Sequence, residues 1–173
     1  GYREYGHAAS ICILAVACLE SYVMRVRYVN GARDYELIKQ PVFAYLGQLY
    51  SDYPYNDETI ELFIQRDAIV HNHLWVIDYE YDNNFSVLSQ GVDKKSTGDK
   101  KYSQYVNKSC TSLLGLQLNP TAVGRKDVKT VLNTIWKILL YLENKDINQC
   151  YVSDTHVKYK DNIIKLSVLM QRT

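Results

Sequence analysis

Apolar positions in the first fifty residues recur at helical spacing and predict two helices. The first covers residues 5–28. Its residues at helical spacing are Ile11, Leu14, Ala15, Cys18, Tyr22 and Val26. Ile13, Val16 and Leu19 fill other faces, so we expect the first half to be buried nearly all round. The second helix covers residues 35–50. Pro41 marks its start or a break in it, because proline lacks the N–H group that a helix interior requires.

A third helix is expected after the turn-forming residues 51–57. Asn56 or Asp57 is suited to cap it, and Glu58 and Glu61 suit its first turn because carboxylates stabilise a helix N-terminus. Its buried stripe is formed by Ile60, Phe63 and Ile64. The third helix therefore has an acidic start and an apolar face.

The period of the pattern changes to two after residue 74. Alternating large residues predict strands over residues 75–81 and 85–88, joined by a turn at Asn83-Asn84. The polar, lysine-rich and glycine-punctuated segment at residues 91–101 is expected to be an exposed, mobile loop. Together they predict a β-hairpin followed by a loop.

The clearest amphipathic helix covers residues 125–143. Its apolar face is formed by Val128, Val131, Leu132, Ile135, Leu139 and Leu142. Alternation returns at residues 156–159 and at Ile164, Leu166 and Val168, with a turn at residues 160–162 between them. This pattern predicts a C-terminal β-hairpin.

Composition places the chain among ordinary globular proteins, since 47% of its 173 residues are apolar and 23% are charged. A net charge of +1 gives no overall basic field for nucleic acid, although an enzyme acting on RNA needs only a local basic site. The sixteen tyrosines favour a mixture of core and surface roles over base stacking.

Four scattered cysteines without a CxxC pair favour a reduced, cytoplasmic protein with no structural zinc. The apolar run at residues 8–19 has no basic flank or clear cleavage site typical of a signal peptide. It is also shorter than the roughly 20 residues that cross a bilayer. No membrane association is therefore expected.

Candidate chemistry lies at the end of the third helix. Asp67 and His71 are four residues apart, so they share one face, and the carboxylate is placed to orient the imidazole. Arg66 and His71 are five apart, which separates them by about 140° around a straight helix and about 7.5 Å along it. They converge on one small group only if the helix bends, the arginine wraps round, or a second chain completes the site.

Arginine and histidine together suit RNA cleavage, in which the ribose 2′-hydroxyl is the nucleophile. An imidazole exchanges protons near neutral pH, and a guanidinium holds the phosphate through its planar, charged fork. The spacing alone also fits a structural Asp67–His71 pair beside a surface arginine. Glu20, at the edge of the first helix's buried segment, either meets an arginine or a backbone donor or faces a site.

The segment Arg66-Asp67-Ala68-Ile69-Val70-His71 resembles the signature of the HEPN family, which is arginine, a polar residue, three residues of any kind and histidine. Residues 17–23, which place small and apolar residues around Glu20, look like the family's first-helix pattern, and the helix at residues 125–143 looks like its closing helix. The strands and loop at about 75–118 depart from a minimal HEPN bundle.

The resemblance implies a mainly α fold over residues 1–173, an antiparallel helical bundle, and the predicted β-hairpin is an insertion into it. It also implies a metal-independent endoribonuclease in phage defence or a toxin–antitoxin system, acting on RNA, regulated by an antitoxin or similar protein, and forming a homodimer with a composite site. By that resemblance His71 is general base or acid, Arg66 holds the scissile phosphate and Asp67 orients His71.

No cofactor or metal is expected. His71 and His73, two residues apart, point to different faces of a helix and make a poor metal pair. Asn72 and His73, like Glu20, are expected neighbours of the site, and no role is assigned to them.

Two other functions remain open. One is a non-catalytic HEPN-like module that binds RNA, a nucleotide or a partner protein through the same groove, which the near-neutral charge favours. The other is a helical dimerisation domain in which Asp67 and His71 form a core contact. The presence of both Arg66 and His71 favours the enzyme, because a binding module does not need that pair.

Overall fold

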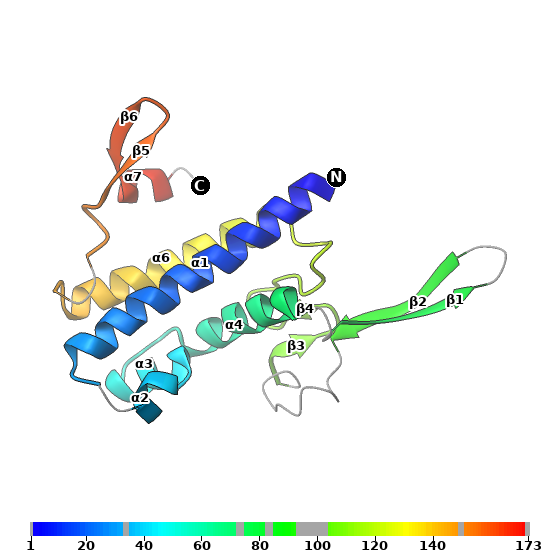
Figure 1. The fold of residues 1–173 in the computed structure, drawn as a ribbon, viewed down its shortest axis with the longest axis horizontal. Helices are drawn as coiled ribbons and strands as arrows, with labels where there is room; N and C mark the ends of the chain where they lie inside the picture. The colour runs from blue at the N-terminus through cyan, green and yellow to red at the C-terminus, as the bar shows by residue number, and fades with distance from the viewer. Residues whose placement is uncertain are drawn as a thin grey trace.

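The chain folds into a mainly helical domain with three antiparallel strand pairs, which confirms the expected class (Figure 1). The computed structural model describes residues 2–32, 35–71, 75–81, 85–92, 104–148 and 151–171. The helices are α1 (Tyr2–Val29), α2 (Tyr35–Lys39), α3 (Val42–Leu49), α4 (Asn56–Val70), α6 (Arg125–Lys145) and α7 (Leu166–Met170). The strands are β1 (Trp75–Tyr81), β2 (Phe85–Val92), β3 (Val106–Asn107), β4 (Cys110–Thr111), β5 (His156–Tyr159) and β6 (Asn162–Lys165).

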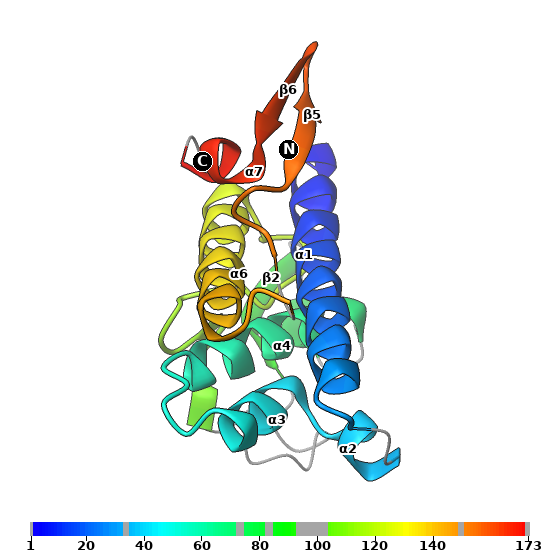
Figure 2. The same ribbon diagram turned by 90° about the vertical axis from the view of Figure 1, so that its left-hand side faces the viewer.

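The two long helices α1 and α6 lie side by side and run in the same direction (Figures 1 and 2). At their N-terminal ends Arg125 forms an ion pair with Glu4 at 2.8 Å. At their C-terminal ends Arg25 donates to the carbonyl oxygen of Asn148 at 3.5 Å. Helix α4 packs on α1 in the opposite direction. The expected antiparallel arrangement therefore relates α4 to the long helices, which are themselves parallel.

Helix α1 buries one face rather than nearly every face, so the expectation for its first half was wrong. Its core-facing residues are Ala8, Ala9, Cys12, Val16, Leu19, Val23 and Val26. Leu14 is 68% exposed and Cys18 is also exposed. The physical reason is that α4 and α6 cover only part of an evenly apolar helix, and helical periodicity cannot rank faces that are all apolar.

The expected second helix is broken at Gln40 and Pro41 into α2 and α3. Arg27 of α1 holds the break in place, since its Nη1 donates to the carbonyl oxygen of Ile38 and its Nη2 to that of Gln40. The break thus lies beside the C-terminal part of α1.

Helix α4 is the central helix, and nearly all of its middle turns are buried. Its N-cap is Tyr55 with no side-chain cap, which corrects the expectation for Asn56 or Asp57. Glu61, expected in the first turn, is fully buried and accepts hydrogen bonds from the backbone N–H groups of Leu113 and Leu114, each at 2.7 Å. A carboxylate on α4 therefore fixes the loop after β4.

The hairpin of β1 and β2 is confirmed and projects from the helices (Figure 1). Strand β2 extends to Val92, so Gly91 belongs to a strand rather than to the expected loop. The turn at Asn83-Asn84 and the rest of that loop lie outside the described residues.

The C-terminal hairpin of β5 and β6 is also confirmed, and it stands apart from the helical body (Figure 2). Leu166 and Val168, expected in its second strand, lie in helix α7 instead. Their apolar spacing of two residues fits both structures in so short a segment, which explains the error.

One helix among the described residues, Glu4–Val29, is long and apolar enough to cross a bilayer, with a mean hydropathy of 1.7. In the most apolar 18-residue stretch of this helix, a third of the residues are buried in the protein. Core helices of soluble proteins and N-terminal signal sequences share these properties, so this helix alone assigns no location.

Candidate functional site

The motif residues lie at the C-terminal end of α4. The helix ends at Val70, and the backbone N–H of His71 donates to the carbonyl oxygen of Asp67 at 2.8 Å. That bond carries the helical register to His71, so Asp67 and His71 lie one turn apart along the same helix. His71 is an exposed residue directly after the last residue of the helix.

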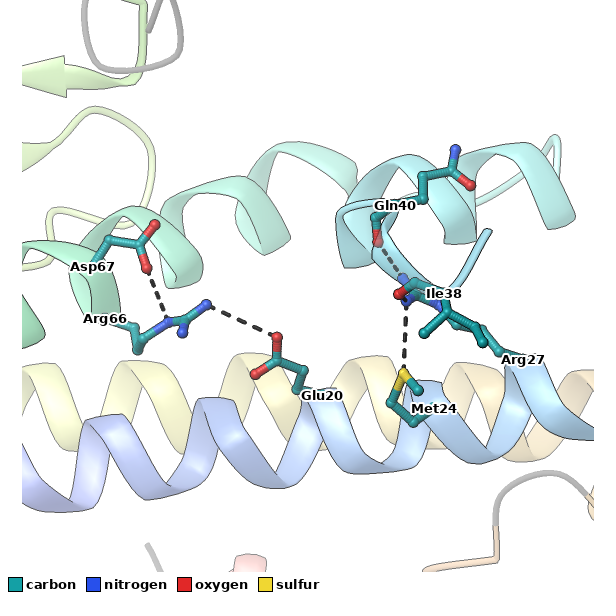
Figure 3. A network of polar contacts seen from close by, with 7 residues as sticks. All are labelled: Glu20, Met24, Arg27, Ile38, Gln40, Arg66 and Asp67. Carbon is teal, nitrogen blue, oxygen red and sulfur yellow. Dashed lines mark hydrogen bonds and ion pairs between the residues drawn. The ribbon is translucent and has the colours of Figure 1, made fainter. Parts of the chain in front are cut away.

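Arg66 lies between α4 and α1 and contacts a carboxylate from each (Figure 3). Its Nε is 3.0 Å from Oδ1 of Asp67, and its Nη2 is 4.0 Å from Oε1 of Glu20. The guanidinium also lies 5.1 Å from the centre of the Phe63 ring, within the range of a cation–π contact. The charged end of Arg66 is therefore held on three sides while 28% of its side chain stays exposed.

A pocket of about 440 Å³ opens beside this arginine. Helices α1 and α4 form two of its walls and the α2–α3 junction forms the third. Its charged lining residues are Glu20, Arg27, Lys39, Arg66 and Asp67, and its apolar ones are Met24, Ile38, Pro41, Val42, Phe43 and Phe63. The volume lies within the range of small-molecule sites, and three cations face two carboxylates.

Arg27 is the most buried of the pocket's charged residues, with only 3% of its surface exposed. Burial lowers the pKa of Arg27, while the neighbouring Tyr45 and Glu20 act in the opposite direction. Its guanidinium lies 4.8 Å from the centre of the Tyr45 ring and donates to two carbonyl oxygens of the α2–α3 junction. Arg27 thus supports the wall of the pocket.

The structure brings together three residues singled out in the sequence, Glu20, Arg66 and Asp67, all of which line the pocket. His71 is not among the lining residues, so one chain does not place Arg66 and His71 in the same cavity. Asn72 and His73 lie outside the described residues.

Sequence reasoning missed Arg27 and the contribution of the α2–α3 junction. A signal for Arg27 was present, because Glu20, Met24 and Arg27 follow one another at spacings of four and three and therefore share a helix face. For the junction there was no local signal, since its position depends on contacts with α1.

Within the described ranges, no group of three or more His, Cys, Asp or Glu side chains is arranged to hold a metal ion. The chemistry available at the pocket is recognition of an anion by Arg66 and Lys39, acceptance of hydrogen bonds by Glu20 and Asp67, and burial of an apolar group. The imidazole of His71 adds proton transfer outside the pocket.

Comparisons of the chain with protein-family models, curated proteins and solved structures found no match. The resemblance to the HEPN family therefore stays a prediction from the motif at Arg66–His71 and from the helices around it.

Proposed function

We propose that the protein is a metal-independent endoribonuclease of the HEPN type. The observation that carries the proposal is the position of Arg66. It lies at a pocket between two helices, held by Asp67 and Glu20, with His71 one turn further along the same helix. A fixed guanidinium suits a phosphate, and a nearby exposed imidazole suits proton transfer.

The reaction requires only these two kinds of group. A base takes the proton of the ribose 2′-hydroxyl as its oxygen forms a bond to phosphorus. The bond from phosphorus to the 5′-oxygen of the next nucleotide breaks, and an acid gives that oxygen a proton. The products are a 2′,3′-cyclic phosphate and a 5′-hydroxyl. Arg66 stabilises the charge that develops on the phosphate oxygens.

A homodimer supports this chemistry better than a single chain. One copy offers one His71, at the end of α4 and outside the pocket that Arg66 lines. Two copies related by a two-fold axis would bring two arginines and two imidazoles to one cleft, so that one His71 acts as base and the other as acid. By the same resemblance, the biological setting is phage defence or a toxin–antitoxin system.

A second candidate is a non-catalytic module that binds RNA or a nucleotide. The contact at 3.0 Å between Arg66 and Asp67 favours it, because a neutralised arginine can serve recognition without catalysis. The absence of His71 from the pocket lining also favours it.

Cleavage in the presence of excess chelator separates the two candidates. Total tRNA and mRNA are incubated with the wild-type protein and with Arg66→Ala and His71→Ala variants. The enzyme predicts chelator-resistant cleavage that falls by at least about a hundredfold in each variant, since general acid–base catalysis alone contributes that much. The products should carry a cyclic phosphate.

The matched controls are Arg125→Ala, whose side chain is 88% exposed, and His156→Ala, an exposed histidine in β5. Both should cleave at the wild-type rate. If Arg66→Ala and His71→Ala also cleave at that rate, the activity comes from elsewhere. RNA binding that requires Arg66 but leads to no cleavage, with the protein freed of any bound inhibitor, supports the binding module.

A further inference from the structure

The pocket beside Arg66 has two chemically different ends. Arg66, Asp67 and Glu20 lie at one end, and Met24 and Ile38 lie at the other, together with Arg27 and Gln40 (Figure 3). The charged end holds the guanidinium of Arg66, whose Nε lies 3.0 Å from Asp67 and whose Nη2 lies 4.0 Å from Glu20, and 28% of this side chain stays exposed to an anion. A ligand that suits this lining carries an anion next to hydroxyl groups, and further away a flat ring that has apolar faces and polar edges.

A ribonucleotide has this distribution. Its phosphate suits Arg66, and its ribose hydroxyls suit Glu20, because carboxylates accept hydrogen bonds from sugar hydroxyls at nucleotide sites. Glu20 is well placed for this role, since 46% of its side chain is exposed and its Oε1 is 4.0 Å from Arg66. The base would pack against the apolar side chains of Met24 and Ile38 at the other end.

The position of His71 decides which nucleotide of an RNA strand the pocket takes. The 2′-hydroxyl that attacks must come within hydrogen-bond reach of an imidazole, and His71 does not line the pocket. The attacking ribose carries that hydroxyl and therefore stays outside, whereas the leaving nucleotide needs only its 5′-oxygen at the mouth of the pocket, where the second imidazole of the proposed dimer can protonate it. We infer that the pocket binds the nucleotide on the leaving side of the scissile phosphate, the one attached through its 5′-oxygen. This inference rests on the proposed function.

Nucleoside monophosphates test the inference without any cleavage. A nucleoside 5′-monophosphate reproduces the linkage on the leaving side, and a 3′-monophosphate reproduces the attacking side. Calorimetric titration of the full chain should give 5′-monophosphates at least about tenfold tighter binding than 3′-monophosphates or inorganic phosphate. Equal binding of the two isomers, or no binding of either at 10 mM, an approximate upper limit for a specific site, would overturn the inference.

Two variants localise the binding. Met24→Trp should fill the pocket and weaken 5′-monophosphate binding by about tenfold or more. The matched control is Leu14→Trp on the same helix, which places the same ring on an exposed part of α1 that does not line the pocket. Glu20→Gln should remove most of the preference for a ribonucleotide over its 2′-deoxy form. Unchanged binding in Met24→Trp would place the ligand elsewhere and contradict the inference.

Oligonucleotide cleavage distinguishes failure of this inference from failure of the proposed function. An abasic residue on the leaving side should slow cleavage by about tenfold, more than the same residue on the attacking side. If the abasic residue on the leaving side does not slow cleavage, the pocket assignment is wrong, whereas the proposed ribonuclease function still holds. Tight 5′-monophosphate binding without any cleavage rejects the ribonuclease and keeps a nucleotide site.

Discussion

Nε of Arg66 lies 3.0 Å from Oδ1 of Asp67, its immediate neighbour in α4. Successive residues of a helix do not normally face each other, so the arginine side chain has to turn along the helix surface to make this contact. The same turn brings its Nη2 toward Glu20 of α1. Asp67 therefore directs Arg66 into the pocket, in addition to any role toward His71.

We predict that Asp67→Asn lowers RNA cleavage by roughly five- to tenfold, because an ion pair that is only partly exposed contributes about 1 kcal/mol to holding its partner. The free energy of unfolding should change by less than about 1 kcal/mol. Single-turnover rates and denaturant titration measure the two effects. Asp161→Asn, at an exposed turn of the C-terminal hairpin, is the control. A wild-type rate in Asp67→Asn would show that Arg66 needs no carboxylate beside it.

Replacing Glu61 should destabilise the fold strongly. Its carboxylate is fully buried and accepts hydrogen bonds from the N–H groups of Leu113 and Leu114. Alanine removes both bonds and leaves donors unsatisfied, so we expect Glu61→Ala to lower the free energy of unfolding by about 2–4 kcal/mol. Urea titration followed by circular dichroism measures the loss. Glu80, exposed in β1, gives a matched control, since Glu80→Ala should change stability by less than about 0.5 kcal/mol.

Thiol reactivity should separate two cysteines of α1. Burial, with a smaller effect from Asp127, raises the pKa of Cys12 to about 12, so roughly one thiol in ten thousand is ionised at pH 8. Cys18, about 120° away around the helix axis, is exposed, although partial burial raises its pKa as well. Alkylation at pH 8, mapped by peptide mass, should modify Cys18 at least about tenfold faster than Cys12. Equal rates in the native protein would contradict the assigned buried face of α1.

Attachment of the C-terminal hairpin should depend on pH through Glu143. Burial raises the pKa of Glu143, but hydrogen bonds from Ser153 Oγ and from the N–H groups of Val152 and Ser153 outweigh it, and the net pKa is below its ordinary value. A depressed carboxyl pKa gives stability that is complete above the unfolded-state pKa. That stability is lost as the pH falls through the folded-state value.

Hydrogen exchange measures this effect. After correction for intrinsic rates, amides at residues 152–171 should exchange faster as the pH falls below the ordinary pKa of a glutamate, before the amides of α6 do. Glu143→Gln should speed exchange at neutral pH and flatten the pH dependence, whereas Glu80→Gln, the same change at an exposed glutamate of the other hairpin, should behave as wild type. The same pH dependence in Glu143→Gln and in the wild type would rule out Glu143 as the group responsible.

Local signals in the sequence were enough to place most of the elements. Helix α6 and strands β1 and β5 appear where periodicity predicts them, and Pro41 marks the observed break because the effect of proline on a helix is local. The buried face of α1 was misassigned, since Leu14 and Cys18 are as apolar as the residues that the core covers. Which face is buried depends on α4 and α6, which are distant in sequence.

In the candidate site too, some residues could be predicted from local sequence and others depend on contacts between distant elements. Arg66, Asp67 and His71 were found by their spacing, which is a local property. The pocket depends on Arg27 and on the α2–α3 junction, whose relation is a contact between separate elements. Glu61 was expected only as a carboxylate of the first turn, and its burial depends on the loop at Leu113, which is distant in sequence.

The parallel direction of α1 and α6 also constrains how the chain folds. Two adjacent helices joined by a short turn are antiparallel and can associate as soon as both are made. Here the whole segment between Val29 and Arg125 must be spanned before Arg125 can reach Glu4. Closing so long a loop costs entropy before any contact is gained, so this mainly helical protein should fold more slowly than a simple up-and-down bundle. During synthesis, the apolar face of α1 is not covered by its main partner until α6 has been made.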